Sequence, residues 1–196
     1  MKNLLGPLER LYPMPCVLVV GGTMEQADTL AVAWINVISS TPPTIAMGLR
    51  DSRRTLELIR ATGDFTVNVP DTSLVAAVDY CGITSGRGTD KFAETGLTLE
   101  PSSLVSAPLI AQCPYNLECR VSGEVATVGS YVVVLGEIVE THAEERILRA
   151  GTDIVEMEAL DPLCYIAGTR EYRAVGSKVA DAYSIGKTIA DSHPDS

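Results

Sequence analysis

The sequence has little histidine and no excess of basic charge. His142 and His193 are its only two histidines, so a metal site built from several histidines is not expected. The chain carries 25 acidic against 15 basic residues, and its lysines and arginines are scattered along the chain. Such a charge pattern does not suit the phosphate backbone of a nucleic acid, so we expect no nucleic-acid partner.

Long apolar runs are also missing. No run approaches the roughly 18 residues that are needed to cross a bilayer. Glu9 and Arg10 interrupt residues 1–22 at the place where a signal peptide has its apolar stretch. We therefore expect no membrane partner and a cytoplasmic location.

Several catalytic motifs are absent as well. The five cysteines form no C-x-x-C pair and are read as reduced, mostly buried thiols: Cys16, Cys81, Cys113, Cys119 and Cys164. A Ser-His-Asp triad would have to use His142, but no G-x-S-x-G accompanies it. Residues 19–23 suggest the turn of a dinucleotide-binding fold, but no G-x-G-x-x-G follows, so this motif is too weak to use.

What remains is a chain of strands with short helices between them. Its 196 residues suit one domain, without internal repeats. Strand composition, bounded by Gly and Pro, occurs at residues 16–20, 29–38, 44–49, 64–69, 115–127, 131–141 and, last, 163–166. Helical signals occur from Thr55, from Pro70 to Gly82, at residues 90–95 and, briefly, at 143–149. This order predicts a mainly β fold, a β-barrel decorated with short helices. Residues 177–196 are expected to form an arm or a flexible tail.

The start of the first predicted helix combines cations and hydroxyl groups. Ser52, Arg53, Arg54 and Thr55 precede Leu56 and Ile59, which are three residues apart and should face the core. The first turn of a helix has free N–H groups and a partial positive charge, and therefore favours a phosphate or carboxylate. The alternative interpretation is that Ser52 is simply the N-cap and the arginines are solvated.

Lys91 is a second candidate for binding an anion. It lies in the first turn of the predicted helix at residues 90–95, where a lysine opposes the helix dipole. The alternative is an ordinary surface lysine.

An ordered series of segments gives the chain a family resemblance. It begins with Asp28 and LAVAW (30–34), SSTPP (39–43), SRRTLELI (52–59) and GDFTVNVP (63–70), and continues with Ser85-Gly86, TDKF (89–92), PLI (108–110), LEC (117–119), GEIV (136–139) and Tyr172. In this order the segments resemble the flavin reductase-like family of FMN-binding split barrels, and within it the flavoredoxin-like members. The likeness covers residues 11–176, within a domain that we place at residues 1–176.

The resemblance implies a homodimer of six-stranded, Greek-key-like barrels that hold non-covalent FMN at the subunit interface. It places the isoalloxazine ring against Trp34, Ser39 and Ser40, and the phosphate near Arg53 and Thr55. Lys91, Asp28, Thr29 and Tyr131 complete the cofactor-binding set that the resemblance implies. The cofactor would carry the chemistry, so no catalytic side chain is assigned.

Three functions follow as hypotheses. The first is an oxidoreductase, an NAD(P)H-dependent flavin reductase or a related enzyme, with NADH or NADPH as reductant. The second is an electron carrier of flavoredoxin type, in which FMN passes electrons to a redox partner protein without a nicotinamide substrate. The third is a ligand-binding barrel without redox activity, suggested by Asp28 and Tyr131, where the chain departs from the family pattern.

Overall fold

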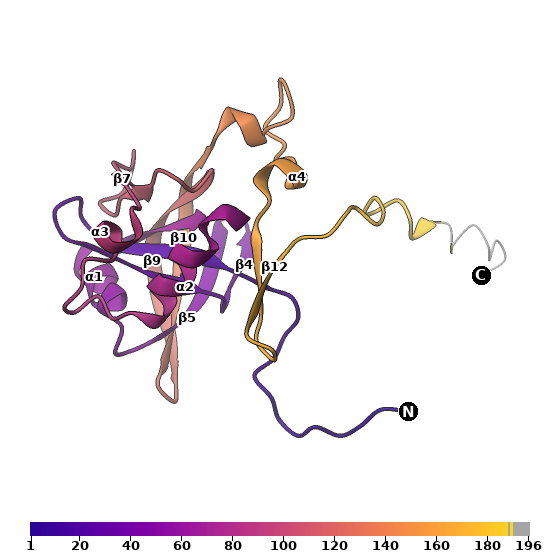
Figure 1. The fold of residues 1–196 in the computed structure, drawn as a ribbon, viewed down its shortest axis with the longest axis horizontal. Coiled ribbons are helices and arrows are strands. Elements are labelled where there is room, and N and C mark those ends of the chain that lie inside the picture. The colour runs from indigo at the N-terminus through magenta and orange to yellow at the C-terminus, as the bar shows by residue number, and fades with distance from the viewer. Residues whose placement is uncertain (188, 190–196) are drawn as a thin grey trace.

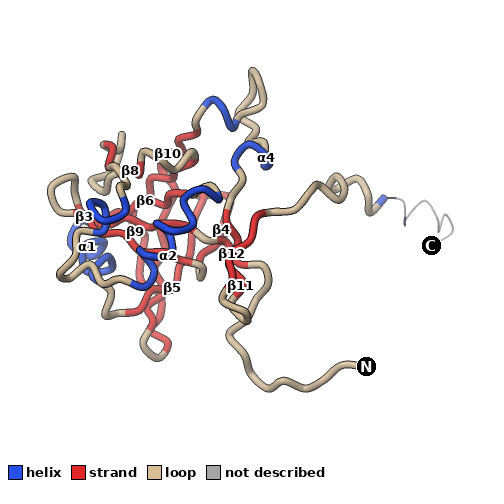
Figure 2. Tube along the Cα trace, in the orientation of Figure 1, coloured by secondary structure: helices blue, strands red, loops and turns tan. Residues whose placement is uncertain are grey.

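The computed structural model describes residues 1–187 and residue 189. Strands form the centre of the molecule and helices lie around it (Figure 1, Figure 2). The main antiparallel sheet contains β2 (Val17–Gly22), β3 (Ala27–Val32), β4 (Ile35–Ser40), β5 (Pro43–Arg50), β6 (Asp64–Val69), β9 (Tyr115–Val128) and β10 (Tyr131–Ala143). The mainly β fold expected from the sequence is confirmed.

The order of the strands in this sheet is β3-β2-β6-β9-β10-β5-β4. Its two edges, β3 and β4, follow one another directly in the chain. The prediction of one continuous strand at residues 29–38 was therefore wrong. After Val32 the chain leaves β2 and bends at Ala33 and Trp34, and the Trp34 carbonyl then accepts a hydrogen bond from Gly48 N of β5 at 2.9 Å. This bend gives seven strands instead of the six expected.

Two pairs of consecutive strands form hairpins. β2 pairs antiparallel with β3, and β9 pairs with β10 around the turn at Gly129 and Ser130. The paired region between β4 and β5 is longer than predicted. We expected strand pairing to end before residues 39–43, which contain two prolines. The pairing of β4 with β5 instead continues up to Ser40, which lies opposite Pro43. Proline is tolerated there because it is the first residue of its strand.

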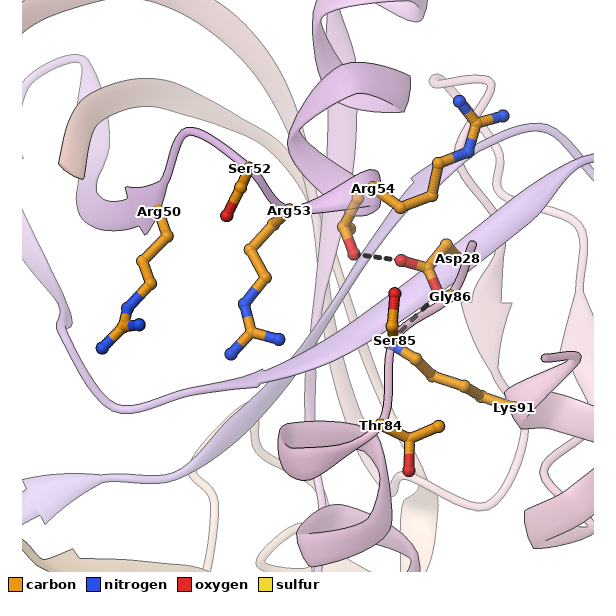
Figure 3. Close-up of a pocket in the computed structure, with 10 residues that line it drawn as sticks. Asp28, Arg50, Ser52, Arg53, Arg54, Thr84, Ser85, Gly86 and Lys91 are labelled. Atoms are coloured by element: carbon orange, nitrogen blue, oxygen red, sulfur yellow. Dashed lines mark hydrogen bonds and ion pairs between the residues drawn. The ribbon is translucent and has the colours of Figure 1, made fainter. Parts of the chain in front are cut away.

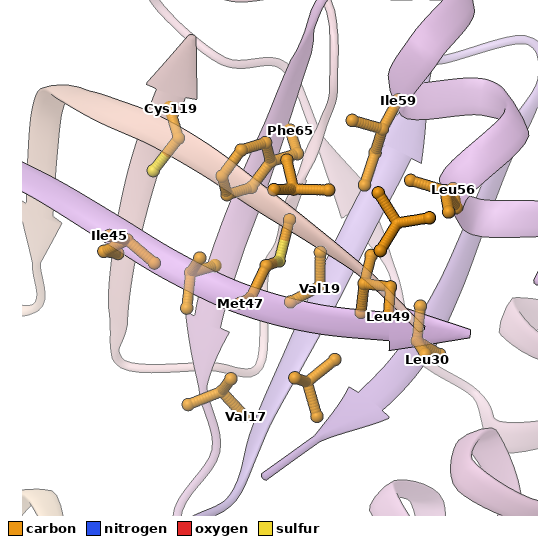
Figure 4. Packing of buried hydrophobic residues seen from close by; sticks show 14 residues of the cluster. Val17, Val19, Leu30, Ile45, Met47, Leu49, Leu56, Ile59, Phe65 and Cys119 are labelled. Carbon is orange, nitrogen blue, oxygen red and sulfur yellow. The ribbon is translucent and has the colours of Figure 1, made fainter. Parts of the chain in front are cut away.

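The core is divided by β2, which is buried along its whole length. Val17 and Val19 face the interior of the barrel, where they join Ile45, Met47 and Phe65 (Figure 4). Leu18 and Val20 face the opposite way and pack with Val78 and Cys81 of α2 (Val75–Ile83). An apolar run without alternation is typical of a strand that is covered on both faces.

α1 (Arg54–Thr62) and α3 (Lys91–Thr95) lie on the same side of the molecule as α2 (Figure 1). α1 packs on β2, β3 and β6 and places Leu56 and Ile59 in the core, as expected. It ends at Gly63, whose φ of 77° is the left-handed conformation that glycine adopts at low cost. α3 is capped by the Asp90 side chain, which accepts from two backbone N–H groups.

Smaller elements complete the chain. They are η1 (Thr72–Leu74), η2 (Glu145–Ile147), α4 (Met157–Leu160), the pair β7 (Leu99–Glu100) and β8 (Leu109–Ile110), and a three-stranded sheet of β1 (Met14–Pro15), β11 (Leu163–Ile166) and β12 (Glu171–Ala174). The expectation that residues 163–166 form the last strand was wrong, because β12 returns antiparallel to β11.

Residues 1–11 and 175–187 extend away from the body on one side (Figure 1). Residues 188 and 190–196 of the predicted arm lie outside the described residues. In the part of the chain that the structure describes, no helix is long and apolar enough to span a bilayer. The cysteines are free thiols, four of them buried and Cys164 half-buried. Burial raises the pKa of Cys81 to about 11, so this thiol is protonated at neutral pH.

Candidate functional site

A polar pocket of about 250 Å³ opens beside the start of α1 (Figure 3). Three parts of the chain surround it: β3, the turn from β5 into α1, and the segment that follows α2. Its lining consists of Asp28, Arg50, Ser52, Arg53, Arg54, Thr55, Thr84, Ser85, Gly86 and Lys91. Candidates named from the sequence therefore meet in one pocket, although Asp28 and Lys91 are 63 residues apart: Asp28, Ser52, Arg53, Arg54, Thr55 and Lys91.

The helix start in this pocket carries no side-chain cap. The N-cap is Arg53, in extended conformation, and not Ser52, so the interpretation of Ser52 as N-cap was wrong. The reason is local. Arg53 N donates to the carbonyl of Arg50 at 3.0 Å and closes a turn there, so the helix begins one residue later than it would with Ser52 as N-cap. The first-turn N–H groups keep their capacity to bind an external anion.

Two arginines extend side by side into the pocket (Figure 3). Among the described residues, neither Arg50 nor Arg53 has a carboxylate within salt-bridge distance. Arg53 makes one long contact, from Nη2 to the Gly82 carbonyl at 3.5 Å. Arg54 differs from both, because it points away from them and pairs with Glu57 at 3.1 Å.

Arg50 was missed as a site residue by the sequence reasoning. It lies at the end of β5, and the turn that joins Arg53 N to Arg50 O brings the two guanidinium groups together. The signal in the sequence was the spacing of three residues between Arg50 and Arg53, in the segment between the predicted strand at residues 44–49 and the predicted helix. Arg50 is held by Tyr131, whose hydroxyl accepts from Nε at 2.9 Å.

Asp28, Thr55 and Lys91 form a buried cluster on the other side of the pocket. Thr55 Oγ1 donates to Asp28 Oδ2 at 2.5 Å, and Lys91 Nζ lies 3.2 Å from Asp28 Oδ1. Lys91 also donates to the carbonyls of Thr29 and Cys81. Lys91 is only 3% exposed, which rules out the alternative of an ordinary surface lysine.

Gly86 closes the pocket over the Asp28 carboxylate. A Cβ at this position would lie 2.0 Å from Asp28 Oδ1, so only glycine allows the backbone to approach this closely. The segment after α2 therefore lies directly against the Asp28 carboxylate and limits the space into which this side chain can move.

A smaller hollow of about 60 Å³ continues from the pocket toward the bend between β3 and β4. Arg50 and Arg53 line both spaces, and Trp34 and Tyr131 line the smaller one. The two aromatic rings meet edge to face, with centroids 5.1 Å apart. Tyr131 is a partly exposed residue of β10. The site offers an aromatic wall next to a cationic pocket.

The remaining predicted residues lie outside these two spaces. Thr29 is buried, and its hydroxyl donates to the Val19 carbonyl at 3.1 Å. Its own backbone carbonyl accepts a hydrogen bond from Lys91, and Thr29 contributes to the site in this way. Ser39 and Ser40 lie at the turn between β4 and β5, where Ser39 Oγ accepts from Thr41 N. Within this one chain they are not brought together with the anion pocket.

The described lining of the pocket contains cations, hydroxyl groups and one carboxylate, but no cysteine or histidine. The carboxylate is already paired with Lys91. Such a donor set suits the binding of a phosphate group by charge-assisted hydrogen bonds.

Comparison with known proteins gives a consistent picture. The model of the flavin reductase like domain matches residues 9–176. The fold is similar to the flavoredoxin of Desulfovibrio vulgaris (Miyazaki F), with a TM-score of 0.89 and 34% identity over 95% of this chain and 100% of that one. The flavoredoxin of Methanosarcina acetivorans gives a TM-score of 0.88 and 29% identity over 96% and 100% of the two chains. An uncharacterized protein of Archaeoglobus fulgidus is 37% identical over 144 residues, 73% of this chain and 80% of that protein.

These matches confirm the resemblance drawn from the sequence and the split-barrel fold that it implied.

Proposed function

Because the chain belongs to the flavin reductase-like domain family, we propose that it binds FMN non-covalently and transfers electrons through it. The proposed reaction is that of an NAD(P)H-dependent flavin reductase or a related oxidoreductase. The observation that carries the proposal is the uncapped start of α1 beside Arg50 and Arg53, two cations without a carboxylate partner among the described residues. A phosphate is the ligand that this donor set fits.

The residues present can be assigned to the parts of FMN. Arg50, Arg53 and the first N–H groups of α1 would hold the phosphate. Trp34 and Tyr131, next to the cationic pocket, would bound the space for the ring system. When bound, the flavin supplies the hydride and electron chemistry, and the protein supplies binding, orientation and charge.

A second candidate function is electron transfer between protein partners without a nicotinamide substrate. It is favoured by the similarity to two flavoredoxins over nearly the whole chain. Anaerobic mixing of the FMN-loaded protein with NADH or NADPH separates the two functions. Loss of the oxidised flavin absorbance supports the reductase, and its persistence with both nucleotides supports the carrier.

The proposal predicts that FMN binds more tightly than riboflavin, which lacks the phosphate. Charge-assisted hydrogen bonds contribute about 1.5–3 kcal/mol each, so the preference should be at least about tenfold. The double variant Arg50→Ala/Arg53→Ala should lose this preference in a fluorescence titration. The control is Arg54→Ala, because Arg54 lines the same pocket but points away and pairs with Glu57. Equal affinity of the parent protein for FMN and riboflavin would contradict the proposal.

We further propose a homodimer with the flavin near the subunit interface. β4 is an edge strand whose Val37 and Ile38 are 56% and 57% exposed, and Trp34 stands at its start. Exposed apolar side chains on an unpaired edge favour association with a second chain. Light scattering should give twice the monomer mass of 20.9 kDa. Val37→Asp should shift the protein toward the monomer, and a monomeric parent protein at micromolar concentration would contradict the proposal.

A further inference from the structure

Lys91 lines the anion pocket together with Arg50, Arg53 and the outward-pointing Arg54, but its charge is not available in the same way as that of Arg50 and Arg53. Its ammonium group lies 3.2 Å from Asp28 Oδ1 and also donates to the carbonyls of Thr29 and Cys81. All three hydrogens of an ammonium group can be used by these three acceptors. Lys91 therefore has no donor left for a ligand.

The partner of Lys91 is equally confined. Asp28 is 5% exposed, accepts from Thr55 at 2.5 Å and is covered by the backbone of Gly86. The carboxylate cannot swing away from Lys91 without displacing the segment after α2. Opposite charges at this fixed, short distance largely cancel in the surrounding space, so the field in the pocket comes mainly from Arg50 and Arg53.

Building on the proposed function, we infer that Asp28 limits the affinity of the pocket for the flavin phosphate by neutralising Lys91. Asp28 is then a residue that sets ligand affinity without touching the phosphate. A pocket with two effective cations in place of three holds FMN less tightly. This suits a flavin that exchanges with solvent better than one that is held permanently.

Asp28→Asn tests the inference because asparagine has nearly the same shape and still offers an acceptor oxygen to Thr55. Lys91 would remain anchored by the carbonyls of Thr29 and Cys81, with its charge no longer compensated. We expect Kd to fall about three- to tenfold for FMN and for inorganic phosphate, the size of effect that one charge produces in a partly screened site. Kd for riboflavin should change less than twofold.

The double variant Asp28→Asn/Lys91→Gln completes the design. It restores neutrality, so its Kd for FMN should return to within about twofold of the parent value, as expected if the pair acts through its charges alone. A loss of more than tenfold would show that Lys91 itself binds the phosphate, and would overturn the inference. Lys91→Gln alone leaves the Asp28 carboxylate uncompensated and should weaken FMN binding. This variant makes the opposite change in charge and replaces Asp28→Asn if that variant does not fold.

The remaining outcomes are also decisive. Equal changes for FMN and riboflavin in Asp28→Asn would show that Asp28 contacts the ring or the ribityl chain, and would overturn the inference. Unchanged binding of all three ligands would show that its charge does not reach the pocket, with the same consequence. Absence of FMN binding in the parent protein would instead refute the proposed function.

Discussion

Among the acidic side chains that are buried in the described part of the chain, Asp28 and Glu118 are stabilised in different ways. Asp28 lies beside the anion pocket and is paired with the side chains of Lys91 and Thr55. Glu118 on β9 is fully buried and accepts backbone N–H groups of Ser103, Leu104 and Val105, with His142 at 2.6 Å. The first carboxylate is held by groups that could otherwise serve a ligand. The second is held mainly by main-chain groups of a loop.

The difference indicates different roles. Glu118 fixes the segment after β7 by accepting three of its backbone N–H groups, and Asp64 of β6 accepts two more, from Ser106 N and Ala107 N. Neither Glu118 nor His142 lines the anion pocket. These contacts indicate that Glu118 stabilises the fold, whereas we propose that Asp28 adjusts a binding site. Substitutions that remove one charge at a time can separate these roles.

The largest effect is expected for Glu118→Gln. In either orientation the amide places its NH₂ group against at least one backbone donor, Ser103 N or the pair Leu104 N and Val105 N. Leaving such buried donors unsatisfied should lower the free energy of unfolding by about 2–4 kcal/mol. Urea unfolding followed by circular dichroism measures this loss. The control is Glu137→Gln, an exposed glutamate on the neighbouring β10. FMN affinity of the folded variant should stay at the parent value, and a loss of affinity equal to that of Arg50→Ala/Arg53→Ala would remove the distinction between the two acids.

A smaller effect is expected from pH. Although burial opposes it, the hydrogen bonds from Ser103 N, His142 and Leu104 N hold the pKa of Glu118 below its ordinary value of 4.5. A carboxylate with a lowered pKa stabilises the fold above the unfolded-state pKa, and this contribution is lost as the pH falls through the folded-state pKa. The unfolding free energy of the parent protein should therefore fall more steeply below pH 4.5 than that of Glu118→Gln. Parallel pH profiles would show that Glu118 does not titrate differently in the two states.

The sequence predicted the local elements of this fold well. The apolar run that became β2, the hairpin turn at Gly129 and Ser130, and the helix stop at Gly96 all follow from short-range rules. The break at Ala33 and Trp34 was missed because both residues suit a strand. The chain bends there only because β4 pairs with β5, which no local pattern reveals.

The site, like the fold, was predictable only where its signals lie close together in the sequence. The helix start with Arg53 and Thr55 is a local signal, and the dipole argument singled out Lys91, which the structure shows to be buried. The ion pair between Asp28 and Lys91 joins residues that are far apart in sequence, and only the packing of α3 and the segment with Gly86 against β3 creates it. The role of Arg50 depends on a turn geometry that the positions of charged residues alone do not fix.

The edge-to-face contact between Trp34 and Tyr131 has a practical consequence. Trp34 is the single tryptophan of the chain, so the indole emission of the protein comes from one residue beside the pocket. Tyr131 also accepts a hydrogen bond from Arg50, which connects the indole to the cations through one aromatic ring. The unmodified protein thus carries its own optical reporter, and filling of the pocket can be followed by tryptophan fluorescence without a label.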